Sequence, residues 1–206
     1  MKTERDYVND IAEIRSIMER SSKFLSLSGW AGILAGIYAL VGAYIAHAFL
    51  GFRPSEAAYS EGAISSSELW KVCILAGAVL FFSIVTAIFL SYKRAAKREE
   101  SLWNATARRL LMNMALPLAT GGVLCLVFMA KGLNGLLAPL TLVFYGLALF
   151  NAGNFTFREV RVLGLIQIIL GLTGFAMVGY GLLLWAVGFG LMHIVYGIFI
   201  YLKYER

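Results

Sequence analysis

The dominant pattern along the chain is a succession of long apolar stretches separated by short polar connections. A membrane-spanning helix needs about 20 largely apolar residues, and six windows of the sequence meet this requirement. These windows lie at 27–50, 69–92, 110–130, 135–153, 161–180 and 182–202. The last two form one apolar block, which Gly179-Tyr180-Gly181 divides because glycine favours turns. The pattern predicts an all-α membrane protein, a six-transmembrane-helix bundle of three consecutive hairpins.

The N-terminal 26 residues follow a different pattern. Between residues 4 and 24, four apolar side chains recur at helical spacing among charged ones: Tyr7, Ile11, Ile14 and Met18. This predicts an amphipathic helix lying in the cytoplasmic headgroup plane, although a helix that packs on a partner protein or on the chain itself is the alternative. We therefore divide the chain into an interfacial segment, 1–26, and a six-span transmembrane domain, 27–206.

The composition agrees with lipid as the solvent. Of the 206 residues, 60% are apolar, 15% are charged and 21 are glycines. A soluble domain of this size has too much surface to hide so many apolar side chains, so a soluble enzyme, a nucleic-acid-binding module and a disordered chain are excluded. The net charge of +6 is better explained by basic residues retained on the cytoplasmic side of a membrane than by binding to nucleic acid.

The distribution of lysine and arginine predicts the orientation. Fifteen of these residues lie in the N-terminal segment, the 93–109 and 154–161 connections and the C-terminal tail. The alternate connections hold only three, Arg53, Lys71 and Lys131. Because basic residues remain in the cytoplasm, we expect a multi-pass protein of the cell membrane with both termini cytoplasmic and the 51–67 loop external.

His193 and Gln167 are the most informative polar residues inside the spans. They lie at similar depth in the last two helices, about 3 Å apart along the membrane normal, and each is flanked by glycines on its helical face. Small residues around a polar one are typical of a helix–helix contact. We expect the two side chains to face each other across the hairpin, with His193 neutral since no span carries a carboxylate near its middle. The pair is either a structural hydrogen bond or a ligand or proton site.

A second group of candidates lies in the third and fourth spans. Asn113 and Asn151 are predicted at nearly equal depth, so that they either pair across a hairpin or line a cytoplasmic vestibule. Pro117, followed by Gly121-Gly122, is expected to kink or loosen the third helix and to free backbone carbonyls near the midplane. Broken helices of this kind accompany binding sites in transporters.

Glycines also predict where helices pack closely. Gly32 and Gly36 form a small-xxx-small face on the first span, and Gly190 and Gly197 share a face of the last span with His193. Such faces favour close packing, either within the subunit or between copies in a homo-oligomer.

No cofactor, metal site or catalytic centre is predicted. Cys73 and Cys125 lie in apolar stretches without a Cys/His cluster. His47 is expected about 13 Å above the midplane, too far from His193 for both to ligate one haem. Motifs for acyl transfer, nucleotide binding and zinc hydrolysis are absent from the sequence, and the spans lack a charged acid/base set. An enzyme is the least favoured class.

Two functions remain. The favoured one is a small permease or channel for a neutral or weakly charged solute, with a pathway near Pro117, Asn113, Asn151 and His193. The alternative is a non-catalytic membrane subunit, scaffold or sensor that docks a membrane or cytoplasmic protein partner through the 4–24 helix and the 93–109 loop. A long water-filled cavity would favour the first, and a dry glycine-packed core the second.

Overall fold

The computed structural model describes residues 27–52, 66–97 and 103–206, and within these ranges the chain forms helices joined by short turns and has no strand. Five spans are single helices: α2 (Gly29–Ala48), α4 (Ser66–Lys97), α5 (Ala105–Ala130), α6 (Leu137–Ala152, preceded by the 3₁₀ turn η1, Asn134–Leu136) and α7 (Arg158–Ala176). The sixth span is composite: η2 (Val178–Tyr180), α8 (Gly181–Trp185), η3 (Ala186–Met192) and α9 (His193–Tyr204). Within the described ranges, six helical segments are thus long and apolar enough to cross a membrane, as predicted.

Some boundaries differ from the prediction. α4 extends five residues beyond 92 to Lys97, and α5 begins at Ala105 rather than at 110, because charged residues are compatible with a helix that continues past the apolar layer. The last apolar block is predicted to divide at Gly179-Tyr180-Gly181, but α7 already ends at Ala176. The predicted N-terminal segment, 1–26, and most of the outer loop lie outside the described residues.

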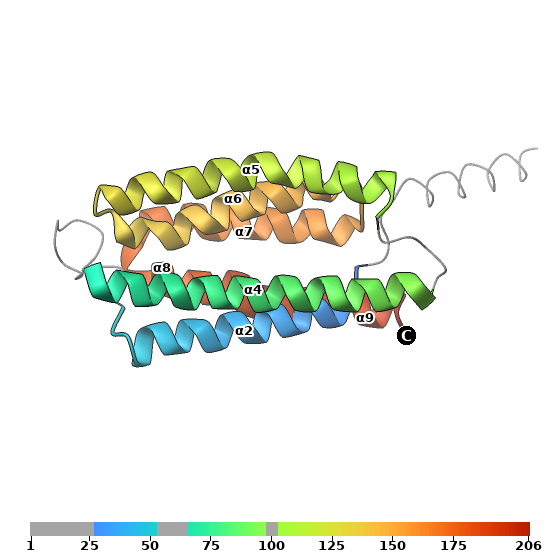
Figure 1. Ribbon diagram of the computed structural model, residues 1–206, viewed down its shortest axis with the longest axis horizontal. Coiled ribbons are helices and arrows are strands. Elements are labelled where there is room, and N and C mark those ends of the chain that lie inside the picture. Colours follow the sequence, from blue (N-terminus) through green and yellow to red (C-terminus); the bar gives the residue numbers. More distant parts are fainter. Residues whose placement is uncertain (1–26, 53–65, 98–102) are drawn as a thin grey trace, which may run out of the picture.

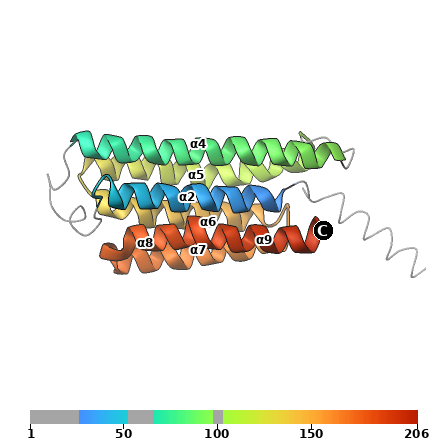
Figure 2. The same ribbon diagram turned by 90° about the horizontal axis from the view of Figure 1, so that it is seen from below.

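The helices form two layers of three (Figures 1 and 2). One layer contains α5, α6 and α7, and the other contains α4, α2 and the α8–α9 segment. Each layer has a central helix, since α6 packs against both α5 and α7, and α2 packs against both α4 and α9. The first two hairpins, α2–α4 and α5–α6, each stay within one layer. The third hairpin joins the layers, because α7 packs against α8, η3 and α9 on the other side.

Glycine allows close backbone contact inside each layer. Between α2 and the last span, a Cβ atom placed on Gly197 of α9 would lie 2.5 Å from the Gly29 carbonyl oxygen, and one on Gly36 would lie 2.5 Å from the carbonyl oxygen of Gly190 in η3. Between α6 and α7, a Cβ atom on Gly164 would lie 2.7 Å from the Gly146 carbonyl oxygen. These distances leave no room for a side chain, so both contacts require glycine. Close approach of this kind is how membrane helices gain packing energy without a hydrophobic driving force.

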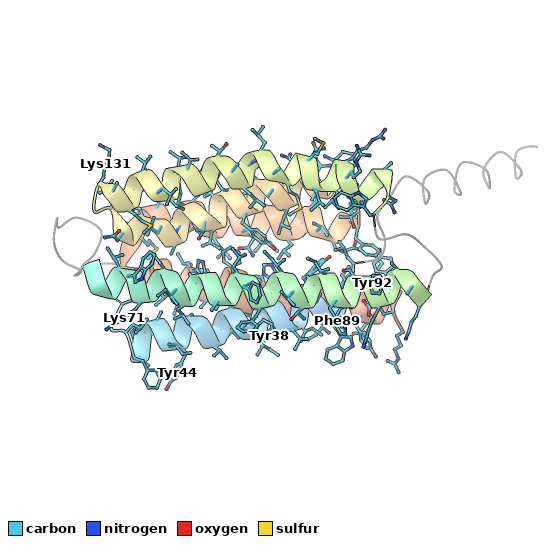
Figure 3. The ribbon with its side chains drawn as sticks, in the orientation of Figure 1. Tyr38, Tyr44, Lys71, Phe89, Tyr92 and Lys131 are labelled. Carbon is cyan, nitrogen blue, oxygen red and sulfur yellow. The ribbon has the colours of Figure 1, made fainter. Side chains whose placement is uncertain are left out.

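The outer helices present apolar side chains away from the bundle. α4 has the most apolar window of the six spans, yet none of that window is buried inside the protein. Its contact with the bundle is mainly α2, where the Tyr38 hydroxyl lies 3.3 Å from Thr86 Oγ1. Exposed aromatic residues occur from Trp70 near the start of α4 to Phe89 and Tyr92 near its end, and the last two are labelled in Figure 3. Hydrocarbon rather than water suits such a surface, which indicates a multi-pass membrane protein.

The two ends of the bundle differ in their number of basic residues. Nine of the described lysines and arginines lie at the end where α2, α5 and α7 begin, which we call the basic end, and two lie at the opposite end. The nine are Lys93, Arg94, Lys97, Arg108, Arg109, Arg158, Arg161, Lys203 and Arg206; the two are Lys71 and Lys131, both at the left of Figure 3. The uneven distribution of basic residues that the sequence predicts is therefore also present between the two ends of the folded bundle.

Arg94 ties three helices together at the basic end. Its guanidinium pairs with Glu205 at 2.6 Å, donates to the Tyr204 carbonyl oxygen at 3.2 Å and donates to the Leu27 carbonyl oxygen. The Glu205 carboxylate also accepts the Gly29 N–H, which satisfies one of the unpaired donors at the start of α2. One ion pair thus joins the end of α4, the start of α2 and the end of α9.

Replacing Arg94 with methionine is expected to lower the free energy of unfolding by about 2–3 kcal/mol. Breaking a fully buried pair costs about 3–5 kcal/mol, and here the side chains keep 11% and 14% exposure, which reduces the penalty. The Arg94→Met/Glu205→Gln double variant should recover most of the loss, since no unpaired charge remains, and Lys97→Met on the exposed face serves as the control. Thermal unfolding in detergent measures all three; a double variant as unstable as Arg94→Met would contradict this explanation.

Candidate functional site

The polar centre of the protein is built on an irregular turn of the sixth span. η3 is a π-helix of seven residues, a wider form that is rare and is frequent at functional sites. Within it, the Gly188 carbonyl oxygen accepts two side-chain hydrogen bonds, from Gln167 Nε2 at 2.8 Å and from His193 Nδ1 at 3.0 Å. α7 supplies the glutamine, and the first residue of α9 supplies the histidine.

These contacts define the protonation of His193. A carbonyl oxygen only accepts, so the proton of the imidazole is assigned to Nδ1. The other nitrogen, Nε2, lies 3.0 Å from the Tyr145 hydroxyl and is then the acceptor of that O–H. All partners of the ring are uncharged, and the result is a neutral imidazole held on both sides, from α6 and from η3.

Gln167 and His193 meet as the sequence predicts, but through a third group. Their nearest nitrogen atoms, Gln167 Nε2 and His193 Nδ1, are 3.4 Å apart. Because both nitrogens donate to the same carbonyl oxygen, the Gly188 oxygen bridges them and no strong direct hydrogen bond is required. The prediction that the two side chains face each other is therefore confirmed, and Gly188, whose carbonyl oxygen lies between them, is a residue of the site that sequence reasoning missed.

Gln167 is fully buried and keeps one oxygen without a partner. Its side-chain oxygen, Oε1, accepts no hydrogen bond from any described residue. The oxygen packs beside the Gly188 Cα, where a Cβ atom would also lie 2.6 Å from Leu142 Cδ2. A buried acceptor without a partner costs about 1–3 kcal/mol, and its presence in a native protein calls for a functional or solvent explanation.

Aromatic rings surround the imidazole. Phe189 stacks on His193 with ring centroids 5.8 Å apart and planes at 10°, and Tyr145 lies 4.9 Å from Phe189 and 5.5 Å from His193. Trp185 extends the stack, 4.9 Å from Phe189. Tyr145 and Phe189 are only half-buried. We call Tyr145, Gln167, Gly188, Phe189 and His193 the His193 cluster.

Glycine contacts fix the backbone of the cluster. Gly190 and Gly197 flank His193 and lie against α2, at Gly36 and Gly29 respectively. A Cβ atom on Gly32 would lie 3.2 Å from the His193 carbonyl oxygen. The face of the last span that carries these glycines therefore packs within the subunit, while the imidazole contacts α6 and η3.

The second group of candidates does not join the cluster. Asn113 is exposed and donates from Nδ2 to the Arg109 carbonyl oxygen of its own helix at 2.8 Å, while Asn151 is half-buried. The predicted pairing of these two side chains is wrong, because within the described ranges no hydrogen bond joins them. Pro117 lies inside an α5 that continues from Ala105 to Ala130, and the irregular π-helical turn of the protein lies in the sixth span, at η3.

The described residues contain no group of three or more His, Cys, Asp or Glu side chains placed to hold a metal ion. Cys73 and Cys125 are free thiols, and His47 is exposed in the last turn of α2.

Comparisons of the chain with protein-family models, with curated proteins and with solved structures find no match.

Proposed function

We propose that the protein is a small permease or channel for a neutral or weakly charged solute, with the His193 cluster as its binding site. The observation that carries the proposal is an uncharged, hydrogen-bonded cluster on a π-helical interruption of a membrane-spanning segment. Polar groups inside a membrane are costly and mark functional positions, and irregular helices accompany binding sites in transporters.

The chemistry of the cluster favours a solute that donates hydrogen bonds. Gln167 Oε1 has no donor among the described residues, and the Tyr145 oxygen, whose O–H is donated to His193, can still accept a hydrogen bond through its lone pairs. No Asp, Glu, Lys or Arg belongs to the cluster, so an ion would enter without a counter-charge, which is unfavourable in a low dielectric. Small alcohols and amides fit these conditions better than ions do.

Flux through proteoliposomes tests the proposal. Stopped-flow light scattering would follow the entry of glycerol, urea and acetamide, with potassium glutamate as the ionic comparison. We expect at least one uncharged solute to enter faster than it enters protein-free liposomes, and the ionic solute to show no acceleration. Rates equal to those of protein-free liposomes for the whole panel would contradict a permease and favour a non-catalytic membrane subunit.

The basic end is proposed to face the cytoplasm, with both termini on that side. Nine basic residues against two among the described residues support this orientation. In a variant without native cysteines, a cysteine replacing exposed Lys131 should react with a membrane-impermeant maleimide in intact cells, whereas one replacing exposed Lys97 should react only after lysis. The opposite labelling pattern would reverse the orientation.

A further inference from the structure

The first turns of α5 and α7 carry four arginines at one end of one helical layer. On α5, Arg108 and Arg109 are exposed between the buried residues Ala107 and Leu110. These buried residues belong to the same core cluster as Val160 of α7. The first turns of the two helices therefore pack on the same core, and α6 lies between the two helices (Figure 1).

α7 repeats this arrangement. Arg158 and Arg161 are exposed on either side of buried Val160. Arg161 also packs against the end of α6, with its guanidinium 4.3 Å from the centroid of the Phe150 ring. This cation–π contact covers one face of the guanidinium and leaves its N–H groups available to an acceptor.

Among the described residues, no acidic side chain neutralises the four arginines. The described ion pairs at this end involve Arg94 with Glu205 and Lys203 with Glu159. Glu159, the acidic residue in the first turn of α7, accepts from Lys203 at 2.7 Å and from the Tyr204 hydroxyl at 3.1 Å on the same oxygen. The first turn of α5 contains no acidic residue. None of Arg108, Arg109, Arg158 and Arg161 forms an ion pair in the described part of the chain.

We propose that this four-arginine surface binds the phosphate headgroup of an anionic phospholipid. The arginines stand at the end of membrane-spanning helices, the depth at which headgroups lie, and both helices begin there, so their N–H dipoles add to the positive field. Arginine binds phosphate through paired N–H groups. Exposed Trp103, two residues before α5, suits the same interfacial layer.

Native mass spectrometry of the full chain in detergent, with added phosphatidylglycerol or phosphatidylcholine, tests the site. An arginine near an anionic surface contributes about fivefold in affinity, so Arg158→Gln/Arg161→Gln should weaken phosphatidylglycerol binding by about tenfold or more. Arg108→Gln/Arg109→Gln should do the same without removing the contact with Phe150. The matched control is Lys71→Gln/Lys131→Gln at the opposite end, which should change binding less than twofold.

The outcomes separate the possible sources of the phosphate. Preferential binding of phosphatidylglycerol that is lost in both arginine variants and kept in the lysine control supports the site. Equal binding of the two lipids, or an equal loss in the lysine control, would overturn it. Competition by glycerol phosphate at the concentration of the lipid would show a soluble phosphate site and would overturn the assignment to a membrane headgroup. None of these outcomes depends on solute flux.

Discussion

Replacing Gly197 with alanine is expected to destabilise the protein by about 1–3 kcal/mol, the usual cost of overpacking. The added Cβ atom would lie 2.5 Å from the Gly29 carbonyl oxygen and 2.6 Å from the Ile33 amide nitrogen. Both are backbone atoms inside α2, and a backbone cannot turn aside as a flexible side chain can. α2 and α9 would have to separate, which would weaken the neighbouring contact between Gly36 and Gly190.

Gly122→Ala on α5 is the matched control, since no atom lies within 4 Å of the added Cβ atom. Alanine favours a helix over glycine by about 0.5–1 kcal/mol, so this variant should be neutral or slightly more stable. Unfolding of both variants in the same detergent would be followed by circular dichroism. Equal stability of Gly197→Ala and the wild-type protein would mean that the two helices do not approach as closely as described.

The arrangement of the chain into six spans could be predicted from the sequence because the lipid bilayer imposes simple rules on the length and composition of a span. A helix must be about 20 apolar residues long to cross the bilayer, so the six spans followed from hydropathy alone. The glycine faces of the first and last spans were visible for a similar reason, since small residues permit close packing. Sequence could not decide whether that packing is within a subunit or between copies; the structure places Gly32 and Gly36 against the last span of the same chain.

Only part of the polar site could be predicted from the sequence. The contact between Gln167 and His193 could be predicted from their similar depth in the membrane, because the depth of a residue follows directly from the rise of its helix. The π-helix that contains Gly188 has no reliable local signature, although two glycines shortly before a buried histidine are a usable hint. Tyr145 is one of 10 tyrosines, and nothing in its neighbourhood marks it as the partner of His193.

The Asn113 prediction failed for a physical reason. Depth along the membrane normal says nothing about rotation around the helix axis, and Asn113 projects from the exposed face of α5. There its amide bonds to the Arg109 carbonyl oxygen, one turn earlier. A short polar side chain can satisfy itself on its own helix in this way, so two asparagines at equal depth need not pair.

Replacing His193 with leucine is expected to reduce solute flux by about tenfold or more while changing stability by about 1 kcal/mol. Hydrogen bonds between membrane helices are worth about 0.6 kcal/mol on average, and Gln167 still donates to the Gly188 carbonyl oxygen in the variant. The variant loses the imidazole that holds the Tyr145 hydroxyl. A solute that depends on these oriented groups loses its hydrogen bonds in the site.

Thr120→Leu on α5 is the control for this substitution. The Thr120 hydroxyl donates to the Leu116 carbonyl oxygen of its own helix at 2.9 Å and is exposed. Replacing it removes a polar group of a membrane helix without touching the His193 cluster, so flux and stability should both remain close to those of the wild-type protein.

The most direct test of the binding-site proposal is the flux of the fastest uncharged solute through His193→Leu proteoliposomes, divided by the amount of folded protein and compared with the wild-type value. We expect a ratio of about one tenth or less, together with wild-type flux in Thr120→Leu. A His193→Leu protein that is folded and carries the solute at the wild-type rate would contradict it, and would leave the His193 cluster as a structural contact between helices.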